Sequence, residues 1–163
     1  MSAGESLWLL LFISWNLVLA YGDLRYRRVP NALVLCGLCG ELLWVGAAFV
    51  ATEWRLPPLW PGWMPALGGF LLALPFFLLW QRRIMGAGDV KVIAVLGFVL
   101  GPLRLLAVLA IASLIGGLHA LLYLAVSRWW TPPGQFRRVP YAGYMALGAI
   151  SVAFIPLSSG WYS

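Results

Sequence analysis

Long apolar stretches dominate this sequence and leave few ways for the chain to fold in water. Of its 163 residues, 63% are hydrophobic and 10% are charged, whereas a typical soluble domain is about 45–50% apolar and about 25% charged. A single core of this size buries only about 70% of the surface of the unfolded chain. The sequence therefore predicts a membrane protein and excludes an ordinary soluble domain, a disordered chain and a disulfide scaffold.

The apolar stretches predict six helices of one membrane bundle. They cover Leu7–Gly22, Ala32–Val50, Trp63–Trp80, Val90–Leu100, Leu103–Val126 and Tyr141–Leu157. A helix needs about 20 residues to cross a hydrocarbon layer of ~30 Å, and the fourth stretch has only eleven. Its helix is either re-entrant or begins within the membrane near Gly86. We expect an all-α polytopic bundle that forms a single domain over residues 1–163.

The basic residues favour six full spans with both termini outside. In that arrangement nine basic residues lie on the inner side: Arg25, Arg27, Arg28, Arg82, Arg83, Lys91, Arg128, Arg137 and Arg138. Only Arg55 and Arg104 then lie outside, whereas a re-entrant fourth segment would change the split to seven and four. Inner loops are normally rich in Lys and Arg. The net charge of +6 therefore indicates orientation in a membrane and no nucleic-acid partner. The residues before the first span include Glu5 and no Lys or Arg, so we expect that span to be retained and not removed as a signal peptide.

The chain has only two aspartates, Asp23 and Asp89, and both fall at the predicted inner ends of apolar helices. Two carboxyl groups brought together share a proton, so one can activate a water while the other donates a proton. Two simpler interpretations remain open: Asp23 as part of a solvated interfacial loop, and Asp89 as a helix N-cap. Gly86-Ala87-Gly88 before Asp89 either admits a substrate backbone or forms a glycine turn.

Other polar residues in the apolar stretches have less specific interpretations. Cys36 and Cys39 are one helical turn apart and are expected to pack, because a lone Cys-x-x-Cys lacks a second pair of metal ligands. Glu41 and His119 lie at similar depths in their helices, so they either contact each other or pack separately. With one His and no ligand cluster, we expect no metal and no cofactor.

Three motifs in this order resemble those of the type IV prepilin peptidases, which are GxGD aspartyl proteases of bacterial membranes. The motifs are Asp23-Leu24-Arg25-Tyr26-Arg27-Arg28-Val29-Pro30-Asn31, Gly86-Ala87-Gly88-Asp89-Val90-Lys91 and Val139-Pro140-Tyr141-Ala142-Gly143 through Gly148. The resemblance implies an endopeptidase of the bacterial cytoplasmic membrane. It would cut the basic leader from prepilins or pseudopilins at the cytoplasmic face, after a Gly. It also implies that Asp23 and Asp89 are the catalytic pair, with Gly86, Gly88 and Lys91 in the active-site loop. For Lys91, contact with a lipid phosphate, the substrate or another loop remains open.

The sequence departs from the long members of this family. It has no large cytoplasmic domain between the first helices and no double Cys-x-x-Cys. The resemblance is therefore to the short peptidases of tight-adherence (Flp-type) pili, and we expect no methyltransferase domain. The substrate's cleavage-site residues and the oligomeric state stay open. The alternatives are a non-enzymatic assembly factor of a pilus or secretion system, and a small ion or proton conductor that uses Asp89 and Glu41.

Overall fold

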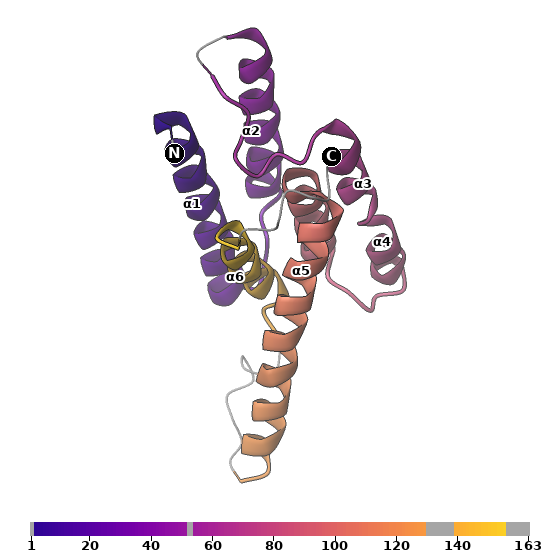
Figure 1. Cartoon of the computed structure of the whole chain (residues 1–163). Helices are drawn as coiled ribbons and strands as arrows, with labels where there is room; N and C mark the ends of the chain where they lie inside the picture. Colours follow the sequence, from indigo (N-terminus) through magenta and orange to yellow (C-terminus); the bar gives the residue numbers. More distant parts are fainter. Residues whose placement is uncertain (1, 52–53, 130–138, 156–163) are drawn as a thin grey trace.

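The computed structural model describes residues 2–51, 54–129 and 139–155, and over these residues helices are the only regular secondary structure. The helices, in chain order, are α1 (Ala3–Tyr26), α2 (Asn31–Val50), α3 (Trp63–Leu71), α4 (Leu74–Gln81), α5 (Ala87–Ser127) and α6 (Tyr141–Ala153) (Figure 1). Within the described residues, four segments are long and apolar enough to cross a membrane: α1, α2, the stretch Trp63–Gln81 and α5. The predicted all-α, membrane-type architecture is confirmed.

The first helix is longer at both ends than its apolar stretch. Ser2 and Glu5 form a reciprocal capping box at its start, and Arg27 ends it in the left-handed conformation with φ of 53°. The Arg27 amide still donates to the Asp23 carbonyl at 2.9 Å. The predicted end at Gly22 is wrong, because a helix continues past its last apolar residue as long as its backbone hydrogen bonds are made. Asp23 therefore lies inside the last turn of α1.

The predicted helix Trp63–Trp80 is divided into α3 and α4. Pro75 lies in the first turn of α4. A proline has no N–H group, and its ring clashes with the carbonyl four residues earlier, so it is tolerated only near the start of a helix. This explains why α3 ends at Leu71 and a new helix begins at Leu74.

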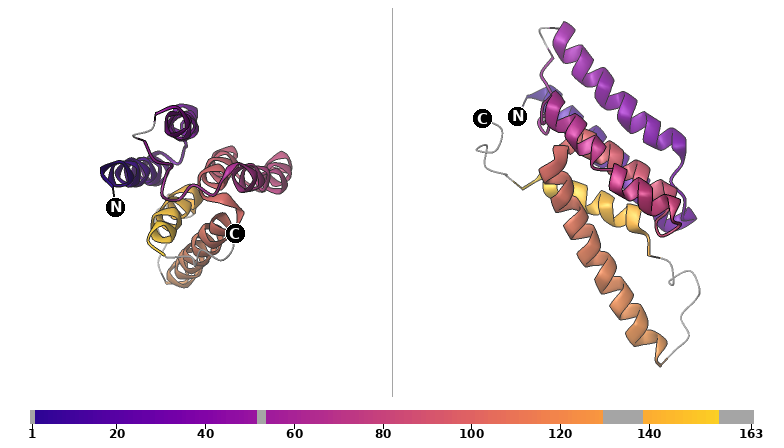
Figure 2. Two further views of the ribbon diagram at one scale, coloured as in Figure 1. Left: turned by 45° about the horizontal axis from the view of Figure 1, so that its top comes forward. Right: turned by 90° about the vertical axis from the view of Figure 1, so that its right-hand side faces the viewer.

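The fifth helix contains a sharp kink. Gly101 has φ of 74° and ψ of 174°, and Pro102 follows it. A continuous helix of 41 residues would be ~62 Å long, about twice the hydrocarbon thickness. In Figure 2 the second half of α5 leaves the bundle at an angle to the first. The kink coincides with the boundary predicted between Leu100 and Leu103.

The first half of α5 forms the centre of the protein. Val92, Ile93, Leu96 and Leu100 are completely buried. Gly69 of α3 and Gly97 of α5 cross so closely that a Cβ atom on either would overlap the other's carbonyl. By contrast, many apolar side chains on the other helices point outward and are exposed, as expected where lipid surrounds a bundle.

One end of the bundle collects the three motif segments. The right-hand view of Figure 2 shows the end of α1 and the starts of α2 and α6 at this end, together with the end of α4. Helix α6 packs against both α1 and α5. Residues far apart in the sequence, in the first and third motifs, are thus brought to the same place.

Candidate active site

Asp23 points from the last turn of α1 to the start of α6. Its side chain is only 8% exposed, and its Oδ2 accepts a 2.9 Å hydrogen bond from the backbone amide of Gly143. The Ala142 amide also interacts with this carboxyl group, as does the charge of Arg27. A helix end, which would otherwise have unpaired N–H groups, therefore holds Asp23.

Asp89 reaches the same helix end from α5. Helix α5 begins after the N-cap residue Gly86, and Asp89 occupies its first turn with its carboxyl group interacting with the Gly86 amide. It also interacts with the Ala142 amide and lies within the electrostatic field of Asp23. The two aspartates, the candidate pair predicted from sequence, thus converge on one amide at the start of α6.

The start of α6 is suited to hold two acidic groups. Pro140 is its N-cap and Tyr141 its first helical residue, so the amides of Ala142 and Gly143 have no partner within the helix. The helix dipole adds a partial positive charge at the same point. This arrangement lowers the electrostatic cost of placing two carboxyl groups side by side. The alternative interpretation of Asp89 as the N-cap is wrong in position, because Gly86 is the N-cap. The carboxyl group of Asp89 does interact with a backbone amide at the helix start, that of Gly86.

The glycines before Asp89 serve close packing within the protein. A Cβ atom on Gly86 would lie 3.0 Å from Oδ2 of Asp89, and one on Gly88 would lie 3.2 Å from Val29. Gly86 has φ of −72° and Gly88 lies within the regular turn of α5, so neither uses left-handed backbone. The space above Gly88 is filled by the protein's own Val29, in place of the substrate backbone that the sequence suggested.

Lys91 joins the first two motifs. Its Nζ donates a 2.6 Å hydrogen bond to Oδ1 of Asn31, the first residue of α2. The sequence left open contact with a lipid phosphate, the substrate or another loop. The structure shows a contact of Lys91 with the protein itself, in the segment that follows α1. This bond holds the start of α2 against the start of α5, beside the aspartates.

Tyr144 also belongs to this site and was not singled out from the sequence. The Tyr144 hydroxyl lies 2.7 Å from Nδ1 of His119, and the charges of Arg27 and Asp23 both act on Tyr144. Arg27 was interpreted only as an orientation signal, yet it is half-buried beside Asp23. The Pro-Tyr stretch of the third motif was the available signal for Tyr144.

The suggested contact between Glu41 and His119 is wrong. Glu41 Oε2 accepts a 2.9 Å hydrogen bond from Nε1 of Trp8, and His119 pairs with Tyr144. The two residues pack separately, which was the other interpretation. Cys36 and Cys39 are free and exposed on α2, and no group of three metal-ligating side chains occurs in the part of the chain that the structure describes.

Comparison with known proteins places this arrangement in a family. The sequence model of the type IV leader peptidase family matches residues 10–121. This chain belongs to the type IV leader peptidase family. The match covers both aspartate motifs of this family member, while the α6 amides lie beyond it. No solved structure matches the chain.

Two curated relatives are both named prepilin leader peptidase/N-methyltransferase. The protein of Bacillus subtilis (strain 168) is 28% identical over 143 residues, which are 86% of this chain and 52% of the relative. The protein of Aeromonas salmonicida (strain A449) is 30% identical over 158 residues, which are 93% of this chain and 51% of the relative. This member of the family spans about half the length of the curated relatives it matches.

Proposed function

We propose that this protein is a membrane aspartyl endopeptidase that removes the leader from prepilins. The observation that carries the proposal is the convergence of Asp23 and Asp89 on the amides at the start of α6. The names of the curated relatives support prepilins as the substrate class.

In the proposed mechanism one aspartate acts as the general base and the other as the general acid. Asp23, which faces Arg27 and the Gly143 amide, is assigned the ionised form and takes a proton from a water molecule. The oxygen of this water attacks the carbonyl carbon of the scissile peptide, while Asp89 gives its proton to the carbonyl oxygen. The tetrahedral intermediate then collapses. Asp23 passes its proton to the leaving nitrogen, the C–N bond breaks, and a hydroxyl proton of the intermediate returns to Asp89.

The start of α6 contributes by preorganisation. Its amides are fixed by the helix, so holding the carboxyl groups requires no reorganisation during the reaction. Both aspartates interact with the Ala142 amide, so the two carboxyl groups are placed to act as a coupled pair. The proposed chemistry requires no metal or cofactor.

We propose that the aspartate end of the bundle faces the cytoplasm, in the bacterial cytoplasmic membrane. The chain would cross the membrane six times, with the kink at Gly101 dividing α5 into two crossings and both termini outside. The distribution of Lys and Arg along the sequence supports this orientation. A leader that stays in the cytoplasm would then meet the aspartates directly.

Cleavage of a Flp-type prepilin by the purified protein in lipid tests the proposal. The variants Asp23→Asn and Asp89→Asn should each lose cleavage by about 10³-fold or more, because each removes one proton-transfer group. The matched control is Glu5→Gln, the same carboxyl-to-amide change at the opposite end of α1, where Gln also serves in a capping box, and it should retain most of the activity. A gel shift follows leader removal. Full cleavage by both Asn variants would overturn the aspartate mechanism. Absence of cleavage by the parent protein would overturn the peptidase proposal and favour a non-enzymatic assembly factor.

A further inference from the structure

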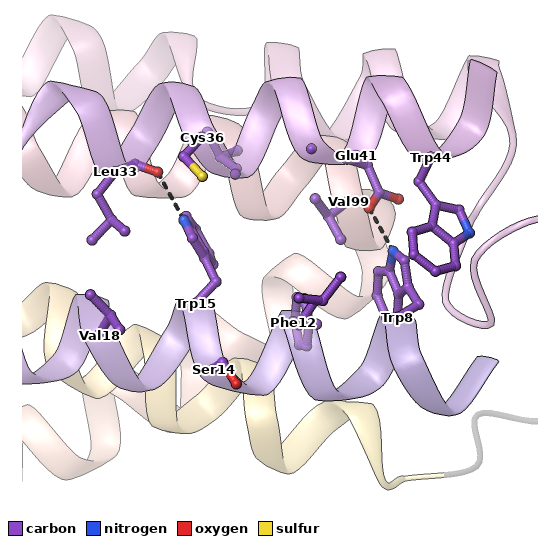
Figure 3. Close-up of a pocket in the computed structure, with 14 residues that line it drawn as sticks. Trp8, Phe12, Ser14, Trp15, Val18, Leu33, Cys36, Glu41, Trp44 and Val99 are labelled. Carbon is purple, nitrogen blue, oxygen red and sulfur yellow. Dashed lines mark hydrogen bonds between the residues drawn. The ribbon is translucent and has the colours of Figure 1, made fainter. Parts of the chain in front are cut away.

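An apolar groove runs between α1 and α2, and neither aspartate is among its lining residues. Its cavity has a volume of about 380 Å³ and is lined by side chains of α1, α2 and the first half of α5. Figure 3 shows that Trp8 and Trp15 of α1 both reach across to α2. Trp15 donates a 2.8 Å hydrogen bond to the Leu33 carbonyl, and Trp8 bonds to Glu41. The groove is therefore bounded by two fixed indole rings.

Glu41 gives this groove a polar feature that lipid cannot satisfy. The residue is 5% exposed and lines the groove, and its Oε1 is buried without a hydrogen-bond partner among the described residues. An unsatisfied buried polar group costs about 1–3 kcal/mol. An acyl chain offers no hydrogen-bonding group, whereas a helix with a polar side chain at this depth does. The groove is thus better matched to a protein helix than to lipid.

The groove also leads to the aspartates. Along α1 it extends from Trp8 to Val18, and Asp23 follows Val18 by five residues, about 7 Å along a helix. Trp8, which bonds to Glu41, precedes Asp23 by fifteen residues, about 22 Å. A helix in the groove with one end at the aspartates would therefore bring its residue at about position 15 to the level of Glu41.

We propose that this groove binds the apolar helix that follows the cleavage point of the protein substrate, and that Glu41 hydrogen-bonds a polar side chain of that helix. The inference rests on the proposed peptidase function. Beyond that function, it assigns the binding site of the substrate helix and the residue that recognises a polar side chain on it. Gly40 suits this use, because it lines the groove and a Cβ atom there would meet nothing within 4 Å.

Crosslinking with the two native cysteines tests the docking site directly. Both are exposed on α2, but only Cys36 lines the groove. The probe is a reporter with a basic leader, a glycine and a Leu/Ala helix that carries single cysteines in its first half. Both measurements use the Asp89→Asn protein, which does not cleave the reporter. The Cys39→Ser variant keeps only Cys36, and the Cys36→Ser variant keeps only Cys39. A bismaleimide should link the reporter to Cys36 about tenfold more than to Cys39.

Blocking the groove gives a second test with a matched control. Gly40→Phe should lower cleavage of the reporter about tenfold, mainly through KM, and leave cleavage of a short leader peptide without the helix unchanged. Gly46→Phe changes the same residue type on the same helix, where an added Cβ also meets open space, but outside the groove. It should stay within about twofold of the parent protein.

The position of Glu41 gives a third test. An Asn at about position 15 of the reporter helix should lower KM several-fold relative to Asn at about position 8, and Glu41→Leu should abolish this difference.

The combined results separate the docking site from the peptidase function. If wild-type protein cuts the reporter, but Cys36 is not preferred and Gly40→Phe leaves cleavage unchanged, the docking site is overturned while the peptidase stands. Linkage to Cys36 without cleavage supports the docking site and overturns the peptidase. Neither cleavage nor linkage overturns both.

Discussion

Asp23 and Glu41 are both buried acids on the first two helices, but they are held in different ways. Asp23 receives main-chain hydrogen bonds from the start of α6 and lies beside Arg27. Glu41 receives one side-chain bond from Trp8, and its other oxygen has no partner among the described residues. Fixed amides preorganise the first site for chemistry. At the second site, one carboxyl oxygen can still form a hydrogen bond with a binding partner.

Among the changes that test this contrast and keep both acids, the largest effect is expected from removing a main-chain donor to Asp23. Gly143→Pro eliminates the N–H that bonds Oδ2 of Asp23, and proline is tolerated in the first turn of a helix. We expect leader cleavage to fall by about 10²-fold, as for loss of one preorganised donor. Steady-state cleavage rates measure this loss.

Gly143→Ala is the control for that change, since it keeps the N–H. A Cβ atom at Gly143 would lie 3.7 Å from its nearest neighbours, which is ordinary contact. Activity within about threefold of the parent protein is therefore expected. If the Ala variant lost as much activity as the Pro variant, space at Gly143 and not the hydrogen bond would be what matters.

A smaller effect is expected at Glu41, and on stability. Trp8→Phe removes the Nε1 donor and leaves Oε2 of Glu41 without its partner, which should cost about 1–3 kcal/mol. Glu41→Gln keeps an acceptor for Trp8 and should cost less. Thermal unfolding in detergent compares the two variants. If both variants lost the same free energy of unfolding, Glu41 would tolerate as little change in its hydrogen bonding as Asp23. The contrast between the two sites would then fail.

The smallest effect is expected at the exposed bond between Lys91 and Asn31. A double-mutant cycle with Lys91→Met and Asn31→Ala should give a coupling energy of about 0.5–1 kcal/mol, typical of one hydrogen bond. Thermal unfolding of the two single variants and the double variant supplies the values. Additive effects would mean that this bond does not hold the motifs together.

Much of the fold follows from local chemistry. In lipid every backbone group must be paired within the chain, so apolar stretches predict helices, and the boundary predicted between Leu100 and Leu103 coincides with the kink in α5. Helix ends were less predictable. Helix α1 continues through Asp23 because polar residues still make helical hydrogen bonds, and Pro75 divides a stretch that looks continuous by hydropathy.

The candidate site was predictable only in part. Asp23 and Asp89 stand out because acidic groups are rare in this sequence and costly in a membrane. Lys91 and Asn31 each belong to a recognised motif, but the hydrogen bond between them was not predicted. The Tyr144–His119 pair was missed because hydroxyl and imidazole groups in apolar helices have many alternative partners.

By itself, the sequence determined that this chain forms apolar helices and that its two aspartates are the leading candidates for chemistry. Both conclusions rest on the cost of polar groups in lipid, which depends on residue type. Only the tertiary structure decided that the aspartates meet at α6 and that Glu41 faces a groove. The donors at α6 are backbone amides, which every residue except proline carries, so packing alone selects those of Ala142 and Gly143.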